Sequence, residues 1–284
     1  MKTAFVCDSG CGLSVKEMEA YGCFSVPLQI SYDNVTKLEG EEISIEETWD
    51  LVESGKVLKT SLAPLGLIEE LFERLKNEGY ERIFATPICK GLSGTIDAME
   101  MMAAQCGLAF DYYDCNVTAV VEAYMTIRSK QLYDEGKSLE EIKALLEKVN
   151  DSTNTLLIPN DLNALAKGGR LTPLAAKLGG LLKIKPILQI NKKTAGRIDV
   201  LDKVRTMPKA LSKTLDTMRE EINGDGEGYN ITVAHVKSEE SGLSLLNMYK
   251  EAFPAAKFQL IKLVSVVGVH TGLGCLAVQY FKEY

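Results

Sequence analysis

Short apolar runs alternate with amphipathic segments along the first half of the chain. The runs have the length and composition of buried strands, and the segments between them repeat apolar residues at helical spacing. Strands separated by helices indicate βαβ crossovers and a mainly parallel sheet covered on both faces, and in such sheets ligands bind beyond the carboxyl ends of the strands. The predicted strands are Thr3–Cys7, Cys23–Val26, Arg82–Thr86 and Ala109–Tyr113, and the predicted helices are Ile45–Ser54, Pro64–Asn77, Thr95–Cys106, Thr118–Asp134 and Ser138–Val149.

The pattern changes after Asp151, where strands become more frequent than helices. Ile187–Ile190 and Ile198–Leu201 flank a short polar connection that contains a glycine, which predicts an antiparallel hairpin. The sequence therefore predicts a Rossmann-like α/β domain over residues 1–151 and an α+β domain with a mainly antiparallel sheet over residues 152–284. The predicted elements of the second domain are strands at Leu156–Pro159, Pro186–Asn191, Arg197–Leu201, Tyr229–His235, Phe258–Leu263 and Cys275–Phe281, and helices at Asp161–Lys167, Thr206–Ile222 and Glu239–Ala252.

Composition excludes several classes of protein. The 284 residues are 46% hydrophobic and 25% charged, which is typical of a globular protein, and the net charge of -7 argues against nucleic acid as a partner. No apolar run is long enough to span a bilayer, and the chain enters a predicted strand at once, so we expect no signal peptide. Seven scattered cysteines favour a reducing cytoplasm. With two histidines and no C-x-x-C pair, we expect no metal site.

The stretch Ile83–Met102 contains a candidate anion site. Its apolar start predicts a buried strand, Pro87 ends that strand, and the turn Gly91–Thr95 opens a helix. Ser93 stands where an N-cap belongs, and the free N–H groups and positive end of a helix also attract anions. Taken alone, simple capping is the more economical interpretation.

Two other segments strengthen the interpretation as a binding site. Thr60 and Ser61 come just before a helix that Pro64 is expected to begin. Near the end of the chain, Gly268–Gly274 places His270 and Thr271 among three glycines after an apolar run that we interpret as a strand. Glycines let the backbone approach a ligand closely, although a lone histidine is more often structural.

Residues 162–198 carry basic side chains without one acidic side chain, in an otherwise acidic protein. The segment is either a solvated basic face or a docking surface for an acidic partner or a phosphate, with Arg170 presented by the turn Gly168-Gly169. Its apolar side chains belong either to a core or to a lipid cavity. The basic residues are Lys167, Arg170, Lys177, Lys183, Lys185, Lys192, Lys193 and Arg197, and the apolar residues are Leu171, Leu174, Leu178, Leu181, Leu182 and Ile184.

Seven motifs follow one another along nearly the whole chain. They are Asp8-Ser9, Lys59-Thr60-Ser61 with Pro64, Gly91-Leu92-Ser93-Gly94-Thr95, Leu165-Ala166-Lys167-Gly168-Gly169-Arg170, Ile184-Lys185-Pro186-Ile187-Leu188, Lys203-Val204-Arg205, and Gly268 to Gly274. In this order they resemble the motifs of the DegV family of bacterial fatty-acid-binding proteins, the lipid-presenting subunits of fatty acid kinase.

The resemblance implies a cytoplasmic, two-domain protein that holds one long-chain fatty acid in a tunnel between its domains. An ATP-dependent kinase would phosphorylate the bound carboxylate for phospholipid metabolism, with Arg170 at the kinase interface. This chain would then be neither the catalyst nor the carrier of a cofactor or metal. The residues implied to bind the carboxylate are Thr60 or Ser61, Ser93 with Gly94 and Thr95, and His270 with Thr271.

The chain departs from the family pattern in three places. Cys11-Gly12 stands where an aspartate often follows the first motif, and Leu273 replaces a frequent proline. Val121 and Ala123 fall where the family usually has a pair of glycines, so larger side chains there are expected to reshape the tunnel.

Two alternative functions are weighed against fatty acid binding. A serine hydrolase would use Ser93 as nucleophile, His270 as base and Asp8 or Asp114 as orienting group, but Thr95 occupies the position where a nucleophile elbow needs glycine. A nucleotide-binding enzyme is less consistent with the sequence, which has no G-x-x-x-x-G-K-[ST] motif and no G-x-G-x-x-G turn.

Overall fold

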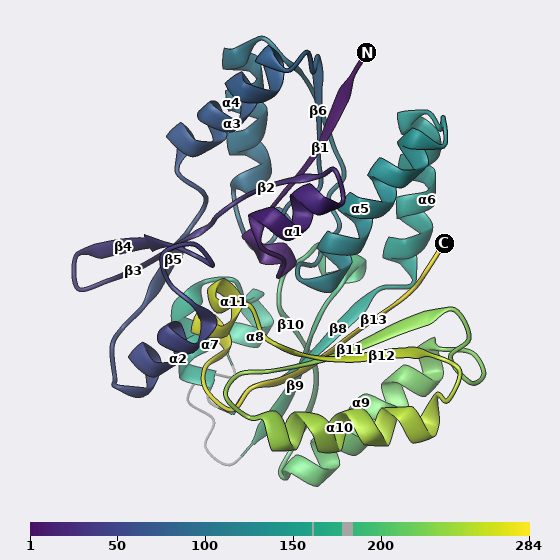
Figure 1. The fold of residues 1–284 in the computed structure, drawn as a ribbon. Coiled ribbons are helices and arrows are strands. Elements are labelled where there is room, and N and C mark those ends of the chain that lie inside the picture. Colours follow the sequence, from purple (N-terminus) through teal and green to yellow (C-terminus); the bar gives the residue numbers. More distant parts are fainter. Residues whose placement is uncertain (161, 178–183) are drawn as a thin grey trace. The chain divides into compact units, whose positions relative to one another are not determined.

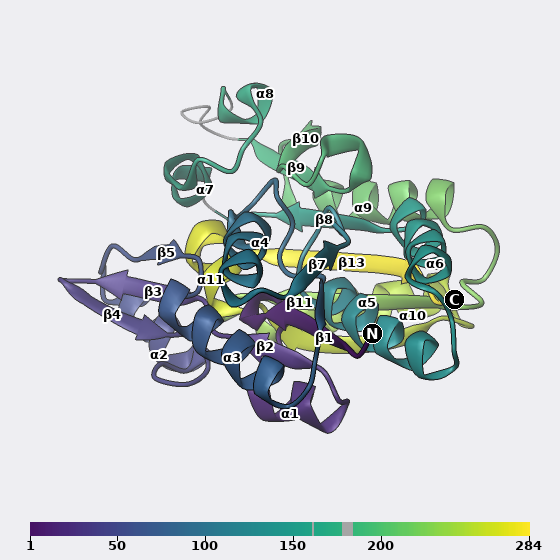
Figure 2. The same cartoon turned by 90° about the horizontal axis from the view of Figure 1, so that it is seen from above.

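The computed structural model of the protein describes residues 1–160, 162–177 and 184–284 (Figures 1 and 2). Within helix α7 (Leu162–Gly168) it describes all side chains except those of Asn163, Ala164 and Lys167. The chain forms two compact units. Unit 1 comprises Met1–Glu147 with Val264–Val266, and unit 2 comprises Lys148–Leu263 with Val267–Tyr284.

Unit 1 contains the predicted parallel sheet. Its four strands lie in the order β2-β1-β6-β7 and every neighbouring pair is parallel. The central strand β1 is buried at every position, as its continuous apolar run predicts. The strands are β1 (Thr3–Asp8), β2 (Phe24–Val26), β6 (Arg82–Ala85) and β7 (Ala109–Tyr112), and the helices of the unit are α1 (Val15–Ala20), α2 (Ile45–Glu53), α3 (Leu65–Asn77), α4 (Thr95–Cys106), α5 (Val120–Asp134) and α6 (Leu139–Asp151).

Helices cover both faces of this sheet because successive side chains of a strand point to opposite sides. Ala4 and Val6 join the buried cluster of α3 and α4. The ring of Phe5, between them in sequence, lies 5.5 Å from Phe84 and 5.4 Å from Tyr133 of α5. Figure 2 shows α3 and α5 on opposite sides of β1.

A second sheet in unit 1 is absent from the predicted elements. It is antiparallel, in the order β4-β3-β5, with β3 (Gln29–Tyr32), β4 (Val35–Leu38) and β5 (Lys59–Ser61). The turn between β3 and β4 consists of Asp33 and Asn34, with φ values of 46° and 65°. Left-handed residues at both central positions are characteristic of the two-residue hairpin, so this Asp-Asn pair was the missed signal.

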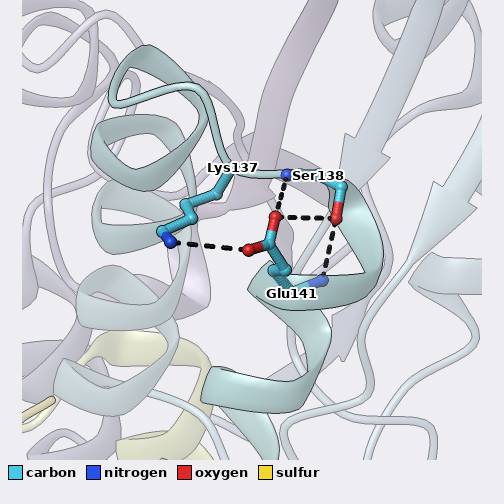
Figure 3. A network of polar contacts seen from close by, with 3 residues as sticks. All are labelled: Lys137, Ser138 and Glu141. Carbon is cyan, nitrogen blue, oxygen red and sulfur yellow. Dashed lines mark hydrogen bonds and ion pairs between the residues drawn. The ribbon is translucent and has the colours of Figure 1, made fainter.

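The helix predicted to begin at Ser138 instead uses this residue as its cap. The Ser138 N–H donates to Glu141 Oε2 at 2.8 Å, and the Glu141 N–H donates to Ser138 Oγ at 3.2 Å (Figure 3). The ammonium of Lys137 lies 3.4 Å from the other carboxylate oxygen of Glu141. This reciprocal capping satisfies N–H groups that the first turn of α6 leaves without helical partners.

Unit 2 contains a six-stranded sheet in the order β10-β9-β8-β13-β11-β12. Every neighbouring pair is antiparallel except β11 with β12, which confirms the predicted mainly antiparallel sheet and the predicted hairpin of β9 and β10. Strand boundaries differ from the predicted ones by a few residues, as strand ends commonly do. The strands are β8 (Asn154–Ile158), β9 (Lys185–Ile190), β10 (Asp199–Val204), β11 (Tyr229–His235), β12 (Lys257–Lys262) and β13 (Leu276–Lys282).

Two long helices cover one face of this sheet. The core there joins side chains of α9, α10 and the central strands, and the Tyr249 hydroxyl lies 2.7 Å from Thr214 Oγ1 within it. Figure 1 shows α9 and α10 side by side under the strands. No helix formed by the described residues has both the length and the apolar content needed to cross a membrane. Besides α7, the helices of the unit are α8 (Pro173–Ala176), α9 (Met207–Glu221), α10 (Glu239–Ala252) and α11 (Ser265–Thr271).

Candidate functional site

The hydroxyls of Thr60 and Ser61 lie on strand β5, and not in the connection that the sequence predicts. Thr60 pairs with Ile30 of β3, and Pro64 is the N-cap residue of α3. Adjacent residues of a strand point to opposite faces, so only one of the two hydroxyls can face a given ligand. Thr60 is half-buried and Ser61 is exposed.

The turn before α4 corrects the prediction that Ser93 caps the helix. Gly94 is the N-cap residue, and the helix has no side-chain cap hydrogen bond. The Ser93 hydroxyl instead lies 2.8 Å from Thr95 Oγ1. Thr95 is fully buried, and its hydroxyl is one of the groups that oppose the rise in the pKa of Asp8. The hydroxyls of this turn are therefore connected to the interior of unit 1.

That interior contains a buried acid pair, by which we mean Asp8 of β1 and Glu122 of α5. Both side chains are fully buried. Asp8 Oδ1 accepts the Gly10 N–H at 2.8 Å, and Asp8 Oδ2 accepts the Ile88 N–H at 3.2 Å. Glu122 Oε2 accepts the Thr118 hydroxyl at 3.0 Å. The Asp8-Ser9 motif marks Asp8 in the sequence, whereas Glu122 was not predicted, because nothing in a helical segment marks a buried glutamate.

Both acids of the pair have raised pKa values. Burial raises the pKa of Asp8 to about 6, although hydrogen bonds from Gly10, Glu122, Ile88 and Thr95 oppose the shift. Burial and the neighbouring charge of Asp8 raise the pKa of Glu122 well above its usual value. Burial therefore favours the neutral form of both carboxyls, and the charge of one opposes ionisation of the other.

Another buried carboxyl, Glu39, accepts a hydrogen bond from the first turn of α11. Its Oε1 accepts the Val266 N–H at 2.8 Å, and its Oε2 accepts the Ser9 hydroxyl at 2.5 Å. Burial raises the pKa of Glu39 to about 7. Glu39 also lines a cavity of about 210 Å³ in unit 1 together with Ser25, whose buried hydroxyl has no hydrogen-bond partner among the residues that the structure describes.

His270 lies on a helix, which corrects the prediction of a Gly-rich turn after a strand. It occupies the last turn of α11, and Thr271 is the final residue of that helix. The glycines of the motif that have a left-handed backbone follow, with φ values of 78° at Gly272 and 77° at Gly274. Thr271 is buried, and its hydroxyl lies 3.5 Å from the Gly268 carbonyl.

The His270 ring lies against the end of α7. A Cβ built on Gly168 would lie 2.8 Å from His270 Nδ1, so the ring packs where only glycine leaves room. Arg170 Nη1 donates to the Gly168 carbonyl at 2.5 Å. Burial, and after it the Arg170 guanidinium, lower the pKa of His270 to about 4, so the imidazole is neutral at neutral pH. The structure thus brings Arg170 and His270 together within unit 2.

A hydrolase would need the Ser93 hydroxyl to donate to His270. The hydrogen bond that the structure gives this hydroxyl is with Thr95. Of the two proposed orienting groups, Asp8 accepts the N–H groups of Gly10 and Ile88 in unit 1. Burial raises the pKa of the other, Asp114.

Some of the basic residues between positions 162 and 198 make structural contacts within unit 2. Lys185 donates to Asn160 Oδ1 at 2.9 Å, Lys192 pairs with Asp151 at 2.6 Å, and Arg197 donates to the Leu171 carbonyl at 3.1 Å. Leu171 is buried as a core residue, whereas Leu174 is 57% exposed. Asp161, Leu178, Leu181, Leu182, Lys183 and the side chain of Lys167 lie outside the described residues.

One cluster has the spacing of metal ligands. Single ligand atoms of Cys7, Cys11 and Glu122 lie within 4.8 Å of one another. Glu122 already accepts the Thr118 hydroxyl, and burial raises the pKa of the Cys7 thiol well above its usual value. A thiol must lose its proton to bind a metal ion, so this raised pKa opposes metal binding at the cluster.

Val121 and Ala123, where the chain departs from the resembled family pattern, are both buried on α5. They flank Glu122 of the buried acid pair in sequence. Their larger side chains are therefore part of the packing of unit 1.

Comparisons with known proteins agree over the whole chain. The model for the DegV family matches residues 2–283. A DegV domain-containing protein of Listeria innocua is 30% identical over 98% of each chain. The fatty acid binding DegV family protein of Streptococcus agalactiae superposes with a TM-score of 0.89 at 26% identity over 100% of each chain. A stearic acid-binding protein of Eubacterium ventriosum, at 20% identity, gives a TM-score of 0.86 over 100% of this chain and 98% of its own.

Proposed function

The chain belongs to the DegV family, and from this membership we propose that it binds one long-chain fatty acid and presents the carboxylate to an ATP-dependent fatty acid kinase. The observation that carries the proposal is the full-length match to the fatty acid binding family protein of Streptococcus agalactiae. The ligand lies in a tunnel between a domain of residues 1–151 and a domain of residues 152–284. The chain works in the cytoplasm without a cofactor.

The acyl tail supplies most of the binding free energy. Removing a methylene group from water contributes about 0.8 kcal/mol, so roughly ten buried methylenes contribute about 8 kcal/mol. The protein therefore does not need a strong ion pair at the head group. It needs hydrogen-bond donors that satisfy the carboxylate out of water.

The carboxylate contacts Thr60, Ser93 with the Gly94-Thr95 turn, and His270 with Thr271. We favour Thr60 over Ser61, because its side chain is half-buried and the two point to opposite faces of β5. His270 contributes a hydrogen bond and no charge, since its pKa is lowered to about 4. These neutral donors orient the carboxylate and leave it reactive toward a phosphoryl group.

Arg170 belongs to the kinase interface in this proposal. Its guanidinium lies at the end of α7 beside His270, in a segment rich in basic residues. A planar, permanently charged guanidinium suits the phosphate groups of a nucleotide or an acidic partner surface. The kinase supplies the catalytic machinery, and this chain supplies a correctly placed substrate.

Native mass spectrometry of the purified protein tests the proposal first. We expect a co-purifying mass of one fatty acid per chain, identified after denaturing extraction. Ser93→Ala and His270→Ala should each speed loss of bound fatty acid by about tenfold or more, the usual worth of a lost hydrogen bond to a charged group. Ser54→Ala is the matched control, because the exposed Ser54 hydroxyl donates only to the nearby Leu51 carbonyl at 2.7 Å.

Arg170→Ala separates the two roles. It should retain the lipid but lose acyl phosphate formation with the kinase, and an empty pocket in this variant would refute the assignment. A wild-type protein that is empty and takes up no added fatty acid would overturn the carrier function. Labelling of Ser93 by a fluorophosphonate would then support the hydrolase alternative.

A further inference from the structure

The first turn of α11 is bound by a buried side chain from a distant part of the sequence. Glu39 is only 5% exposed, and its Oε1 accepts the Val266 N–H at 2.8 Å. Val264, which precedes the helix, has no polar side chain to cap it. The hydroxyl of Ser265, the first residue of the helix, has no hydrogen-bond partner in the part of the chain that the structure describes. Glu39 therefore satisfies an N–H group for which α11 has no helical partner.

Glu39 is itself held in place through its side chain and its backbone. Its second carboxylate oxygen, Oε2, accepts the Ser9 hydroxyl at 2.5 Å, and the oxygen of that hydroxyl accepts the Leu28 N–H at 3.0 Å. The Glu39 N–H donates to the Leu28 carbonyl at 2.9 Å. Ser9, Leu28, Glu39 and Val266 all belong to unit 1. Because these hydrogen bonds fix the carboxyl group, they also fix the peptide of Val266 that donates to it.

Helix α11 carries this position to His270. The helix has seven residues, too few to persist without tertiary contacts. Each residue of an α-helix rises about 1.5 Å along the axis, so His270 follows Val266 by one turn, or about 6 Å. A shift or rotation of the first turn therefore moves the His270 ring as well. The ring has little room to compensate, because a Cβ built on Gly168 would lie 2.8 Å from its Nδ1.

We propose that Ser9 and Glu39 are positioning residues of the fatty acid site, because they hold the first turn of α11 and thereby place the His270 imidazole against the bound carboxylate. This inference rests on the proposed function. A hydrogen bond weakens steeply when donor and acceptor are misaligned, so a small displacement of the ring is enough to lose the one that His270 makes. Ser9 and Glu39 need not contact the ligand in this role.

The release rate of palmitate from delipidated and reloaded protein tests the proposal. The loaded protein is mixed with excess fatty-acid-free serum albumin, and native mass spectrometry follows the loss of the bound mass. Glu39→Ala should speed release about tenfold, as expected for His270→Ala, because both variants lose the same hydrogen bond to the ligand.

Glu39→Gln is the conservative variant that should restore slow release. Its amide oxygen can accept the Val266 N–H, and its NH₂ group can donate to the Ser9 oxygen, which has a second lone pair beside the one that Leu28 uses. We therefore expect release at nearly the wild-type rate. Release as fast as that of Glu39→Ala would contradict the hydrogen bond to Val266 as the link.

A double-mutant cycle separates positioning from general destabilisation. In a His270→Ala background, Glu39→Ala should speed release by less than about twofold, because the contact that it positions is already absent. Glu141→Ala is the matched control. Its carboxylate accepts the Ser138 N–H at 2.8 Å before α6 of unit 1 (Figure 3), so the variant weakens the start of another helix and should leave release unchanged.

Equal factors for Glu39→Ala in the two backgrounds refute the inference, and so does a wild-type release rate in Glu39→Ala. If Glu39→Ala does not fold, Ser9→Ala, which removes the hydroxyl bound to Oε2, replaces it in the cycle and is judged by the same outcomes. Wild-type protein that binds neither palmitate nor another long-chain fatty acid overturns the proposed function. That result is distinct from normal binding that Glu39 does not affect.

Discussion

Gly168→Ala tests whether the end of α7 positions the His270 ring. The added Cβ would lie 2.8 Å from His270 Nδ1 and 3.4 Å from its Cγ, where real Cβ atoms are essentially never found closer than 3.0 Å. Relieving such overpacking costs about 1–3 kcal/mol. Replacing a helical glycine by alanine returns up to about 1 kcal/mol, so we expect a net loss of about 1–2 kcal/mol in the free energy of unfolding.

A double-mutant cycle isolates the contact. In a His270→Ala background the ring is absent, so the same substitution should be neutral or slightly stabilising, and the coupling free energy should be about 2 kcal/mol. Urea unfolding of the four proteins, followed by circular dichroism, gives this number. Gly66→Ala is the control, because Gly66 lies on α3 and no atom of the described part of the chain comes within 4 Å of its added Cβ, so it should stabilise by about 0.5–1 kcal/mol. Equal costs of Gly168→Ala in both backgrounds would refute the argument.

The same contact has a functional consequence. If the Gly168 variant displaces the imidazole, it should lose bound fatty acid faster than wild type, in the direction expected for His270→Ala. A Gly168 variant that is destabilised but retains lipid normally would show that the position of His270 does not matter for binding.

Three further predictions follow from the buried ionisable groups. Arg170→Ala should raise the pKa of His270 from about 4, as NMR titration of the ring proton would show, while that of His235 stays constant. A folded-state pKa of about 7 for Glu39 lies above its unfolded value, so ionisation of Glu39 should remove about 3 kcal/mol of stability as pH rises from about 4.5 to 7. Asp8 and Glu122 add losses of their own, so Glu39→Gln should make the fall in stability about 3 kcal/mol smaller; an equal fall in variant and wild type would contradict this. Gly10→Ala should destabilise by about 1–3 kcal/mol in urea unfolding, because its Cβ would contact three buried oxygen atoms at 2.7–3.1 Å, and an unaffected variant would disprove their convergence.

Local patterns were sufficient for elements whose burial is plain in their own sequence. Helices Thr95–Cys106 and Glu239–Ala252 and strand Tyr229–His235 were predicted to the residue. The periodicity of the two helices reflects one buried face, and the apolar run of the strand reflects burial on both faces, so both signals lie within a short window of the chain. The order of strands and helices then followed from the rules of βαβ and hairpin connections.

The α11 segment shows where local pattern misleads. Ser265–Thr271 is rich in valine, which favours strands, yet it forms a helix. Glu39 lies 227 residues away in sequence and accepts the Val266 N–H at the start of this helix. A first-turn N–H that finds a buried carboxylate stabilises the helix against its propensity, and no window of the sequence contains both residues.

The sequence alone determined the class of the two larger sheets, the order of most elements, the family, and the hydroxyl and histidine positions that became site candidates. Only the tertiary structure decided what those side chains do. In the fold, the Ser93 hydroxyl bonds to Thr95 and does not cap the helix, and Gly168 lies against His270. Asp8 is buried near Glu122 and accepts the N–H of Ile88, 80 residues away in sequence. Periodicity records which face of an element is buried, whereas hydrogen bonding and protonation depend on the particular atoms that meet across the fold.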